Sequence, residues 1–166
     1  MHILKQAALL CCGLLALAAA SIVSAGDDSS PDATFRAGTA QWIAAYNAGN
    51  LDRILALYAE DAMVMPPDAP AASGHAAIRE FLNKDIASSK AAGITLSDLS
   101  SGSTTGTSGD LGWHTGTFAV LDANGKTVVT GKYAEIWRRD GGKWMIIRDM
   151  WNNDAPAAAA AAPAMP

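Results

Sequence analysis

The hydrophobic periodicity of this chain of 166 residues changes near Ile94. Before that point apolar residues recur at the three- and four-residue spacing of helices, whereas after it extended stretches alternate with short turn segments. A run of helices followed by a run of strands favours an α+β fold over alternating parallel units. The sequence therefore predicts a single domain with helices on one face of a curved antiparallel sheet.

Three helices are predicted in the first half of the chain. Residues 30–32 form a typical helix start, because serine caps the first turn, proline fits its first position and aspartate complements the helix dipole. A second, shorter helix is expected after the turn at 47–50, and a third over about 75–90. The apolar positions expected to face the core are Phe35, Trp42, Ile43 and Tyr46, then Leu51, Ile54, Leu55 and Tyr58, then Ile78, Phe81, Leu82 and Ile86.

Strands are predicted for the remaining apolar stretches. The run 62–65 is short and ends at two prolines, which cannot extend a ladder. Turn segments short enough for antiparallel hairpins separate the later stretches, and the Ser/Gly/Thr-rich segment 100–109 is expected to be a flexible hairpin. The later strands are expected over 94–99, 111–122, 127–139 and 143–153.

Residues 1–25 have the order of an export signal, with Lys5 first, an apolar run over 7–20 and small residues up to Ala25. The run holds about 14 strongly apolar residues, fewer than the ~20 that a membrane anchor needs. A lipoprotein is disfavoured because the residue before Cys11 is leucine rather than a small one. We therefore predict cleavage after Ala25 and a periplasmic or extracellular protein with no membrane segment and no cysteine.

The predicted layout has four parts along the chain. They are the signal peptide at 1–25, a short segment at 26–30, the folded domain at 31–154 and an Ala/Pro tail at 155–166 that is expected to be disordered. The formal net charge of −4 argues against nucleic acid as a partner, since nucleic acid is held by clustered Lys and Arg.

The motifs of metal and cofactor sites are not found in the sequence. His75 is expected at the surface, and His114 should point to the sheet face opposite its neighbour Trp113. Because the histidines lack paired spacing and clustered carboxylates, we expect no metal. No nucleophile elbow or phosphate-binding glycine loop occurs either, so no cofactor is expected.

Several short segments together point to one family. They are YNAGNLD at 46–52, LYAEDA at 57–62, GHAAIREF at 74–81, GKY at 131–133 and EIWRR at 135–139. This set resembles the nuclear-transport-factor-2-like (NTF2-like) superfamily, and in particular its SnoaL-like, ketosteroid-isomerase-like branch of mostly unassigned function. The resemblance implies a cone-shaped, curved antiparallel sheet wrapped around three N-terminal helices, a cystatin-like α+β roll. It also implies an enclosed pocket and, often, dimerisation through the outer sheet face.

The resemblance implies positions for acid–base chemistry as well. The general base of the isomerases falls at Met65 and Pro66, neither of which can take a proton. Their oxyanion-donating tyrosine falls near Trp42, which can donate a hydrogen bond but cannot act as an acid. Their protonated acid falls at Glu135, or at Tyr133 if the hairpin gap is placed differently. Any enzyme activity is expected to be cofactor-free and of isomerase, dehydratase or cyclase type.

Strand alternation places two carboxylates on one predicted face. Tyr133, Glu135 and Trp137 share a face of one strand, and Asp149 and Trp151 share a face of the last strand. Two carboxylates that face an aromatic cavity would have perturbed proton affinities, which is typical of functional sites. They could instead form structural pairs with basic side chains or tyrosine hydroxyls.

Two hypotheses about function follow from these features. In the first, an exported protein binds a small apolar ligand, with Glu135 or Asp149 transferring protons and Tyr133 donating a hydrogen bond. In the second, the chain is a non-catalytic association module that forms a homodimer through its sheet. The side chains predicted to line the pocket are Trp42, Tyr46, Tyr58, Met63, Met65, Trp113, Trp137 and Trp151.

Overall fold

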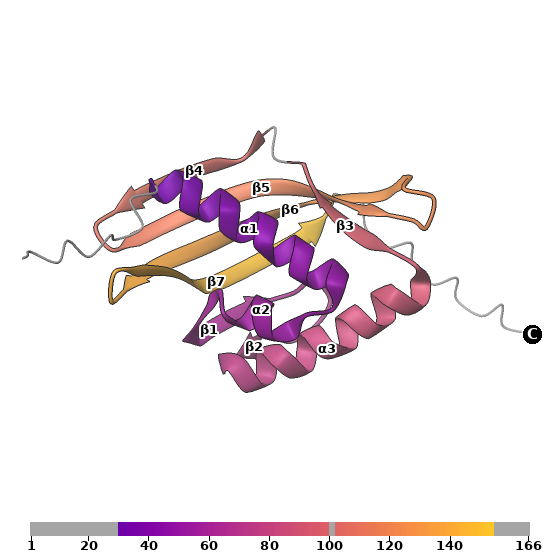
Figure 1. Ribbon diagram of the computed structural model, residues 1–166, viewed down its shortest axis with the longest axis horizontal. Helices are drawn as coiled ribbons and strands as arrows, with labels where there is room; N and C mark the ends of the chain where they lie inside the picture. Colours follow the sequence, from indigo (N-terminus) through magenta and orange to yellow (C-terminus); the bar gives the residue numbers. More distant parts are fainter. Residues whose placement is uncertain (1–29, 100–101, 155–166) are drawn as a thin grey trace, which may run out of the picture.

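The computed structural model describes residues 30–99 and 102–154 (Figure 1). The predicted signal peptide at 1–25 and the predicted tail at 155–166 lie outside the described residues. Within them, the predicted helices and strands occur in the predicted order, and two further short strands, at Ala72–Ser73 and Thr104–Ser108, were not predicted. The helices are α1 (Pro31–Ala48), α2 (Leu51–Leu55) and α3 (Gly74–Ala92), and the strands are β1 (Tyr58–Met65), β2 (Ala72–Ser73), β3 (Thr95–Asp98), β4 (Thr104–Ser108), β5 (Leu111–Leu121), β6 (Thr127–Asp140) and β7 (Lys143–Asn153).

One curved sheet holds all the described strands, in the order β2-β1-β7-β6-β5-β3, with β4 also paired to β5. The β1–β7 pair is parallel and the other pairs are antiparallel. Helix α1 crosses one face of the sheet, and α3 packs against β1 near the sheet edge (Figure 1). The predicted α+β plan is therefore confirmed, with the helices inside the curve of an unclosed sheet.

The helix ends form as the sequence predicts. The side chain of Ser30 accepts a hydrogen bond from the Ala33 amide at 3.3 Å, and α1 ends at Gly49 with a left-handed φ of +70°. The Asn50 side chain then caps α2 by accepting from the amide of Arg53 at 3.1 Å. These caps satisfy backbone groups that would otherwise lack partners at the helix ends.

Tyr58 does not continue the second helix, although its spacing from Leu51 predicted this. Helix α2 ends at Leu55, and Tyr58 begins β1, where it pairs with Ile146 of β7. A five-residue helix gains little stability of its own, so pairing with the sheet decides the conformation here. The change of conformation turns the Tyr58 ring into the interior, where only 1% of its surface is exposed.

The segment at 100–109 is not simply a flexible hairpin, as was predicted. Thr104–Ser108 forms β4, in which Gly106 lies opposite Trp113 of β5. A Cβ atom added at Gly106 would lie 1.9 Å from the Trp113 ring, so the absence of a side chain lets the indole lie across β4. The glycine that suggested flexibility therefore serves close packing.

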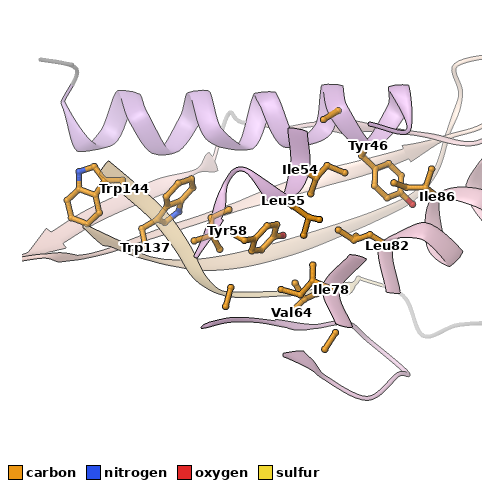
Figure 2. Close-up of a cluster of buried hydrophobic side chains, with 14 of the residues drawn as sticks. Tyr46, Ile54, Leu55, Tyr58, Val64, Ile78, Leu82, Ile86, Trp137 and Trp144 are labelled. Carbon is orange, nitrogen blue, oxygen red and sulfur yellow. The ribbon is translucent and has the colours of Figure 1, made fainter. Parts of the chain in front are cut away.

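The core begins with three aromatic rings near the start of α1. Phe35 stacks on Trp137 at 5.0 Å between ring centroids and meets Trp144 edge-on at 5.1 Å. Figure 2 shows the two indoles at one end of the cluster, with Tyr58 in the middle and Tyr46 at the far end. Aromatic side chains therefore fill the end of the fold where α1 begins.

The close contact between α1 and Trp137 makes Gly38 a test of this packing. An added Cβ atom at Gly38 would lie 2.5 Å from the Trp137 ring. Gly38→Ala is therefore expected to lower the free energy of unfolding by about 1–3 kcal/mol, although alanine normally favours a helix. Denaturant unfolding measures the change. Gly102→Ala is the control, since an added Cβ there meets nothing within 4 Å; a Gly38→Ala protein as stable as the unmodified one would contradict the packing.

Candidate functional site

A cavity of about 200 Å³ lies between helices α1 and α3 and the inner face of the sheet. Most of its wall is apolar, and several polar side chains from α1, α3, β6 and β7 reach into it. The lining residues are Thr39, Trp42, Ile43, Tyr46, Asp85, Ser89, Ile94, Leu96, Phe118, Val120, Tyr133, Glu135, Asp149, Trp151 and Asn153.

Three titratable side chains form a row across neighbouring strands beside this cavity. His114 of β5 lies opposite Glu135 of β6, and Glu135 lies opposite Asp149 of β7. A register shift in β7 brings both Ile146 and Asp149 to buried positions, which strict alternation would not allow. The bulge therefore places Asp149 beside Glu135 while Ile146 stays in the apolar core.

Asp149 is held by one hydrogen bond from within the core. The Tyr58 hydroxyl donates to its Oδ2 atom at 2.5 Å, and Trp42 Nε1 donates to the Tyr58 oxygen at 2.8 Å. Among the described residues no donor contacts Oδ1, and the Asp149 side chain lines the cavity. Burial, with a smaller contribution from the negative charge of Glu135, raises the pKa of Asp149 to about 7, against the lowering effect of the Tyr58 bond.

Glu135, only 4% exposed, receives more hydrogen bonds than Asp149. Trp137 Nε1 donates to its Oε2 atom at 3.0 Å, and the hydroxyl of Thr39 lies 3.3 Å from the same atom. His114 Nδ1 is also 3.3 Å from Oε2. Glu135 thus has several polar neighbours and Asp149 has one hydrogen bond, so the two neighbouring carboxyl groups have different surroundings.

His114 is a site residue that the sequence analysis did not select, because Trp113 was expected to line the pocket and His114 to point to the opposite face. The two side chains do point to opposite faces, but it is His114 that faces the interior, at 1% exposed, and Trp113 that faces outward, at 44% exposed. Thr39 was also missed, because a threonine in the middle of an apolar helix carries no motif. Its hydroxyl lies 3.0 Å from His114 Nδ1 and donates to the Phe35 carbonyl. Strand alternation was the one sequence signal that could have found His114.

Tyr133 connects His114 to the cavity. Its hydroxyl lies 3.4 Å from His114 Nε2, and the two rings meet edge-on at 5.3 Å. Burial, followed by the negative charges of Asp98 and Glu135, raises the pKa of Tyr133 above its ordinary value. Its hydroxyl therefore stays protonated at neutral pH and can donate a hydrogen bond, but it cannot serve as a base.

A second polar group lies at the α3 side of the cavity. The Tyr46 hydroxyl donates to Asp85 Oδ2 at 2.5 Å and lies 2.7 Å from the hydroxyl of Ser89. The Tyr46 ring stacks on Trp42 at 5.2 Å between centroids. The cavity thus has two carboxylate regions, one at Glu135 and Asp149 and another at Asp85.

Of the eight side chains predicted to line the pocket, the structure places Trp42, Tyr46 and Trp151 at the cavity. Tyr58 contacts it only indirectly, through its bond to Asp149. The prediction is wrong for the other four. Trp137 belongs to the core, Met63 and Met65 alternate with the buried Ala62 and Val64 and so face away from the core, and Trp113 lies on the outer sheet face.

His75 also differs from its expected place at the surface. Its Nε2 atom lies 3.0 Å from the Tyr58 carbonyl oxygen, and its side chain is half-buried. Nδ1 lies 3.6 Å from a carboxylate oxygen of the exposed Glu60. These contacts give His75 a structural role at the junction of α3 and β1, outside the cavity.

The described residues contain neither a metal-binding cluster nor a membrane-spanning helix. Between residues 30 and 154, leaving out 100–101, no group of three or more His, Cys, Asp or Glu side chains has an arrangement that could hold a metal ion. Within the same ranges no helix has both the length and the apolar character needed to cross a membrane.

Family comparison agrees with this architecture. A model of the SnoaL-like domain family matches residues 39–147, which include α1 from Thr39 onward and nearly all of the sheet. The chain therefore belongs to the SnoaL-like family of the NTF2-like superfamily. No match was found among curated proteins.

Solved structures show the same fold in distant relatives. An NTF2-like protein with a cystatin-like fold from Novosphingobium aromaticivorans is 18% identical, with a TM-score of 0.65 over 76% of this chain and 83% of that one. A ketosteroid isomerase-like protein from Erwinia carotovora is 19% identical, with a TM-score of 0.57 over 75% of this chain and 96% of that one. A candidate dehydratase of the NTF2-like family from Streptomyces avermitilis is 15% identical, with a TM-score of 0.62 over 76% of this chain and 100% of that one. At these identities the comparison establishes the fold and leaves the reaction open.

The raised pKa of Asp149 predicts a pH-dependent stability. Between its ordinary value of 3.8 and about 7, the folded state binds a proton that the unfolded state has lost. The free energy of unfolding should therefore fall as pH rises through this range, by up to about 1.4 kcal/mol per pH unit from this group.

The variant Asp149→Asn removes this effect, because its amide keeps an acceptor for the Tyr58 hydroxyl but does not ionise. Its stability relative to the unmodified protein should improve as pH rises from 4 to 7 and level off above that. Denaturant unfolding at several pH values measures the difference. Parallel stability curves for the two proteins would show that Asp149 is not protonated in the fold.

Proposed function

We propose that this protein binds a small apolar molecule in the cavity and catalyses cofactor-free acid–base chemistry on it, of isomerase, dehydratase or cyclase type. The observation that carries the proposal is the pairing of Glu135 and Asp149 across neighbouring strands in one cavity. Two like charges so close together are unfavourable, and burial together with the neighbouring Glu135 raises the pKa of Asp149 to about 7, so that Asp149 can carry a proton near neutral pH.

The geometry gives each group a distinct role. Because Tyr58 occupies Oδ2 of Asp149, its proton lies on Oδ1 and can be donated to a ligand oxygen in the cavity. Glu135, oriented by the hydrogen bond from Trp137 Nε1, can accept a proton from a neighbouring carbon and return it elsewhere. Tyr133 supplies a second donor. Proton transfer next to a carbonyl group fits this set best.

The cavity volume limits the size of the ligand. An engineered protein cavity of about 150 Å³ holds benzene. At about 200 Å³ the cavity suits a molecule of one or two small rings, or the reactive end of a longer one. Its wall of Ile43, Leu96, Phe118 and Trp151 favours an apolar body.

A test that needs no knowledge of the natural substrate uses 2-indanone, a small bicyclic ketone. In D2O, the protein should accelerate exchange of the protons next to the carbonyl group, followed by NMR. Glu135→Gln and Asp149→Asn should each slow this exchange by about 100-fold or more, since each removes a proton-transfer group. The rate should also fall as pH rises through about 7, when Asp149 loses its proton.

The matched control for the exchange test is Asp140→Asn, which removes a carboxylate at the exposed end of β6, where it pairs with Arg138. This variant should exchange 2-indanone at the rate of the unmodified protein. Equal rates for Glu135→Gln and the control, or no acceleration by the unmodified protein, would contradict the catalytic role.

The second candidate function, association through the sheet, is favoured by an exposed apolar surface. On the outer face, Trp113 lies opposite Ile136 and Met150 lies one row further along. These side chains are 44%, 37% and 48% exposed. Neighbouring apolar side chains that face solvent together are typical of a protein interface. We propose that a second copy of the chain covers this face in a homodimer.

Ile136→Lys tests the homodimer, because a buried, unpaired charge would oppose association by several kcal/mol. The unmodified protein is expected to have a dimer mass by light scattering, and the variant a monomer mass. Asn83→Lys adds the same charge on the exposed side of α3 and should stay dimeric. A monomeric unmodified protein would overturn this proposal and leave the proposed catalysis untouched.

Export is also proposed, on the sequence of residues 1–25 alone. In that case the ligand would be met in the periplasm or outside the cell, where the cysteine-free domain at 31–154 needs no reducing environment.

A further inference from the structure

The charge of the cavity is strongly one-sided. Its lining includes the carboxyl groups of Asp85, Glu135 and Asp149, and among its described lining residues there is no Lys, Arg or His. These carboxyl groups give a mostly apolar space a negative rather than a positive character. Glu135 is 4% exposed, and a charge in so buried a position is poorly screened by salt, because the surrounding medium has a low dielectric constant.

Two basic side chains on the helices that border the cavity form ion pairs of their own. Arg36 of α1 pairs with Asp32 at 3.1 Å, and Lys84 of α3 pairs with Glu80 at 2.7 Å, both on the surface. His114, which is not among the lining residues, contacts Glu135. Among the described residues no ion pair involves Asp85, whose Oδ2 atom accepts a hydrogen bond from Tyr46 Oη.

The region around Asp85 has the features of a site for a cation. Among the described residues no donor contacts Asp85 Oδ1, and its carboxylate stands beside the Tyr46 ring, which stacks on Trp42. Trp151 and Tyr133 add further aromatic surface to the same cavity. Aromatic faces attract organic cations, and they do so most strongly where water is excluded.

The buried carboxyl group of Asp149 indicates a second polar contact between the cavity and its ligand. Asp149 is 5% exposed and its side chain lines the cavity, while the hydrogen bond that it receives from Tyr58 goes to Oδ2. A ligand group that donates to Oδ1 would add a hydrogen bond to a buried carboxyl group. Asp85 and Asp149 thus give the cavity two polar points.

From these observations we propose that the ligand of the cavity is a small organic cation, an ammonium group on a one- or two-ring apolar body. The ammonium group binds Asp85 Oδ1 against the aromatic side chains, and the body extends toward Asp149. Anionic ligands such as fatty acids are excluded by the same carboxylates. This inference rests on the proposed function and names the ligand class for that site.

Three molecules with the same indane body test the proposal. They are 2-aminoindane, which is cationic at pH 7, 2-indanol, which is neutral, and indane-2-carboxylate, which is anionic. Isothermal titration calorimetry should show the amine binding at least about tenfold more tightly than the alcohol, or about 1.4 kcal/mol. The carboxylate should bind more weakly than the alcohol.

The variant Asp85→Asn assigns the preference to one residue. Its amide oxygen can still accept from Tyr46, so the cavity wall is kept while the charge is lost. The amine-to-alcohol ratio should fall to about twofold or less, with alcohol binding unchanged. Glu80→Gln is the control, because it removes a carboxylate from the same helix at an exposed position; its ratio should match that of the unmodified protein.

The outcomes separate this inference from the proposed function. Equal binding of amine and alcohol, or tighter binding of the carboxylate, would overturn the cationic ligand and leave small-molecule binding intact. Binding of none of the three, together with no exchange of 2-indanone, would overturn both. A preference for the amine that persists in Asp85→Asn would contradict the assigned position of the ammonium group.

Discussion

The burial of two carboxyl groups side by side is the constraint on which the rest of the site depends. Glu135 and Asp149 are directly opposite on neighbouring strands and almost fully buried. In an apolar interior, two ionised carboxylates at such positions would be strongly destabilising. In the fold, Trp137 donates to Glu135 and Tyr58 donates to Asp149, and burial beside Glu135 raises the pKa of Asp149 to about 7.

The aromatic residues divide into two groups with separate tasks. Phe35, Trp137 and Trp144 close the end of the fold where α1 begins and, through Trp137 Nε1, also stabilise Glu135. Trp42 and Tyr46, further along α1, border the cavity instead. Helix α1 crosses one face of the sheet (Figure 1), so Phe35 near its start packs in the core while residues from Thr39 to Tyr46 border the cavity. One helix thus contributes both to the closed core and to the open site.

Sequence reasoning reached the pocket in part, and its errors share a cause. Strand alternation correctly put Glu135 and Asp149 on the buried face, because side-chain direction along a strand depends only on local geometry. It also separated Trp113 from His114, but the choice of Trp113 as the inward residue was wrong. It could not distinguish Trp137, in the closed core, from Tyr133, at the cavity, since both lie on that face. Met63 and Met65 were chosen for residue type, and the register of β1 turned them outward.

By itself, the sequence determined the order of elements, the helix boundaries at Ser30 and Gly49, and the α+β class, because capping residues and hydrophobic periods act over a few residues. Only the tertiary structure decided that Tyr58 leaves the helix to hold Asp149, and that His114, Glu135 and Asp149 stand in one row. These contacts join residues 14 to 91 positions apart, through strand register and helix docking. Such non-local pairings depend on the whole sheet, and no short segment of the chain specifies them.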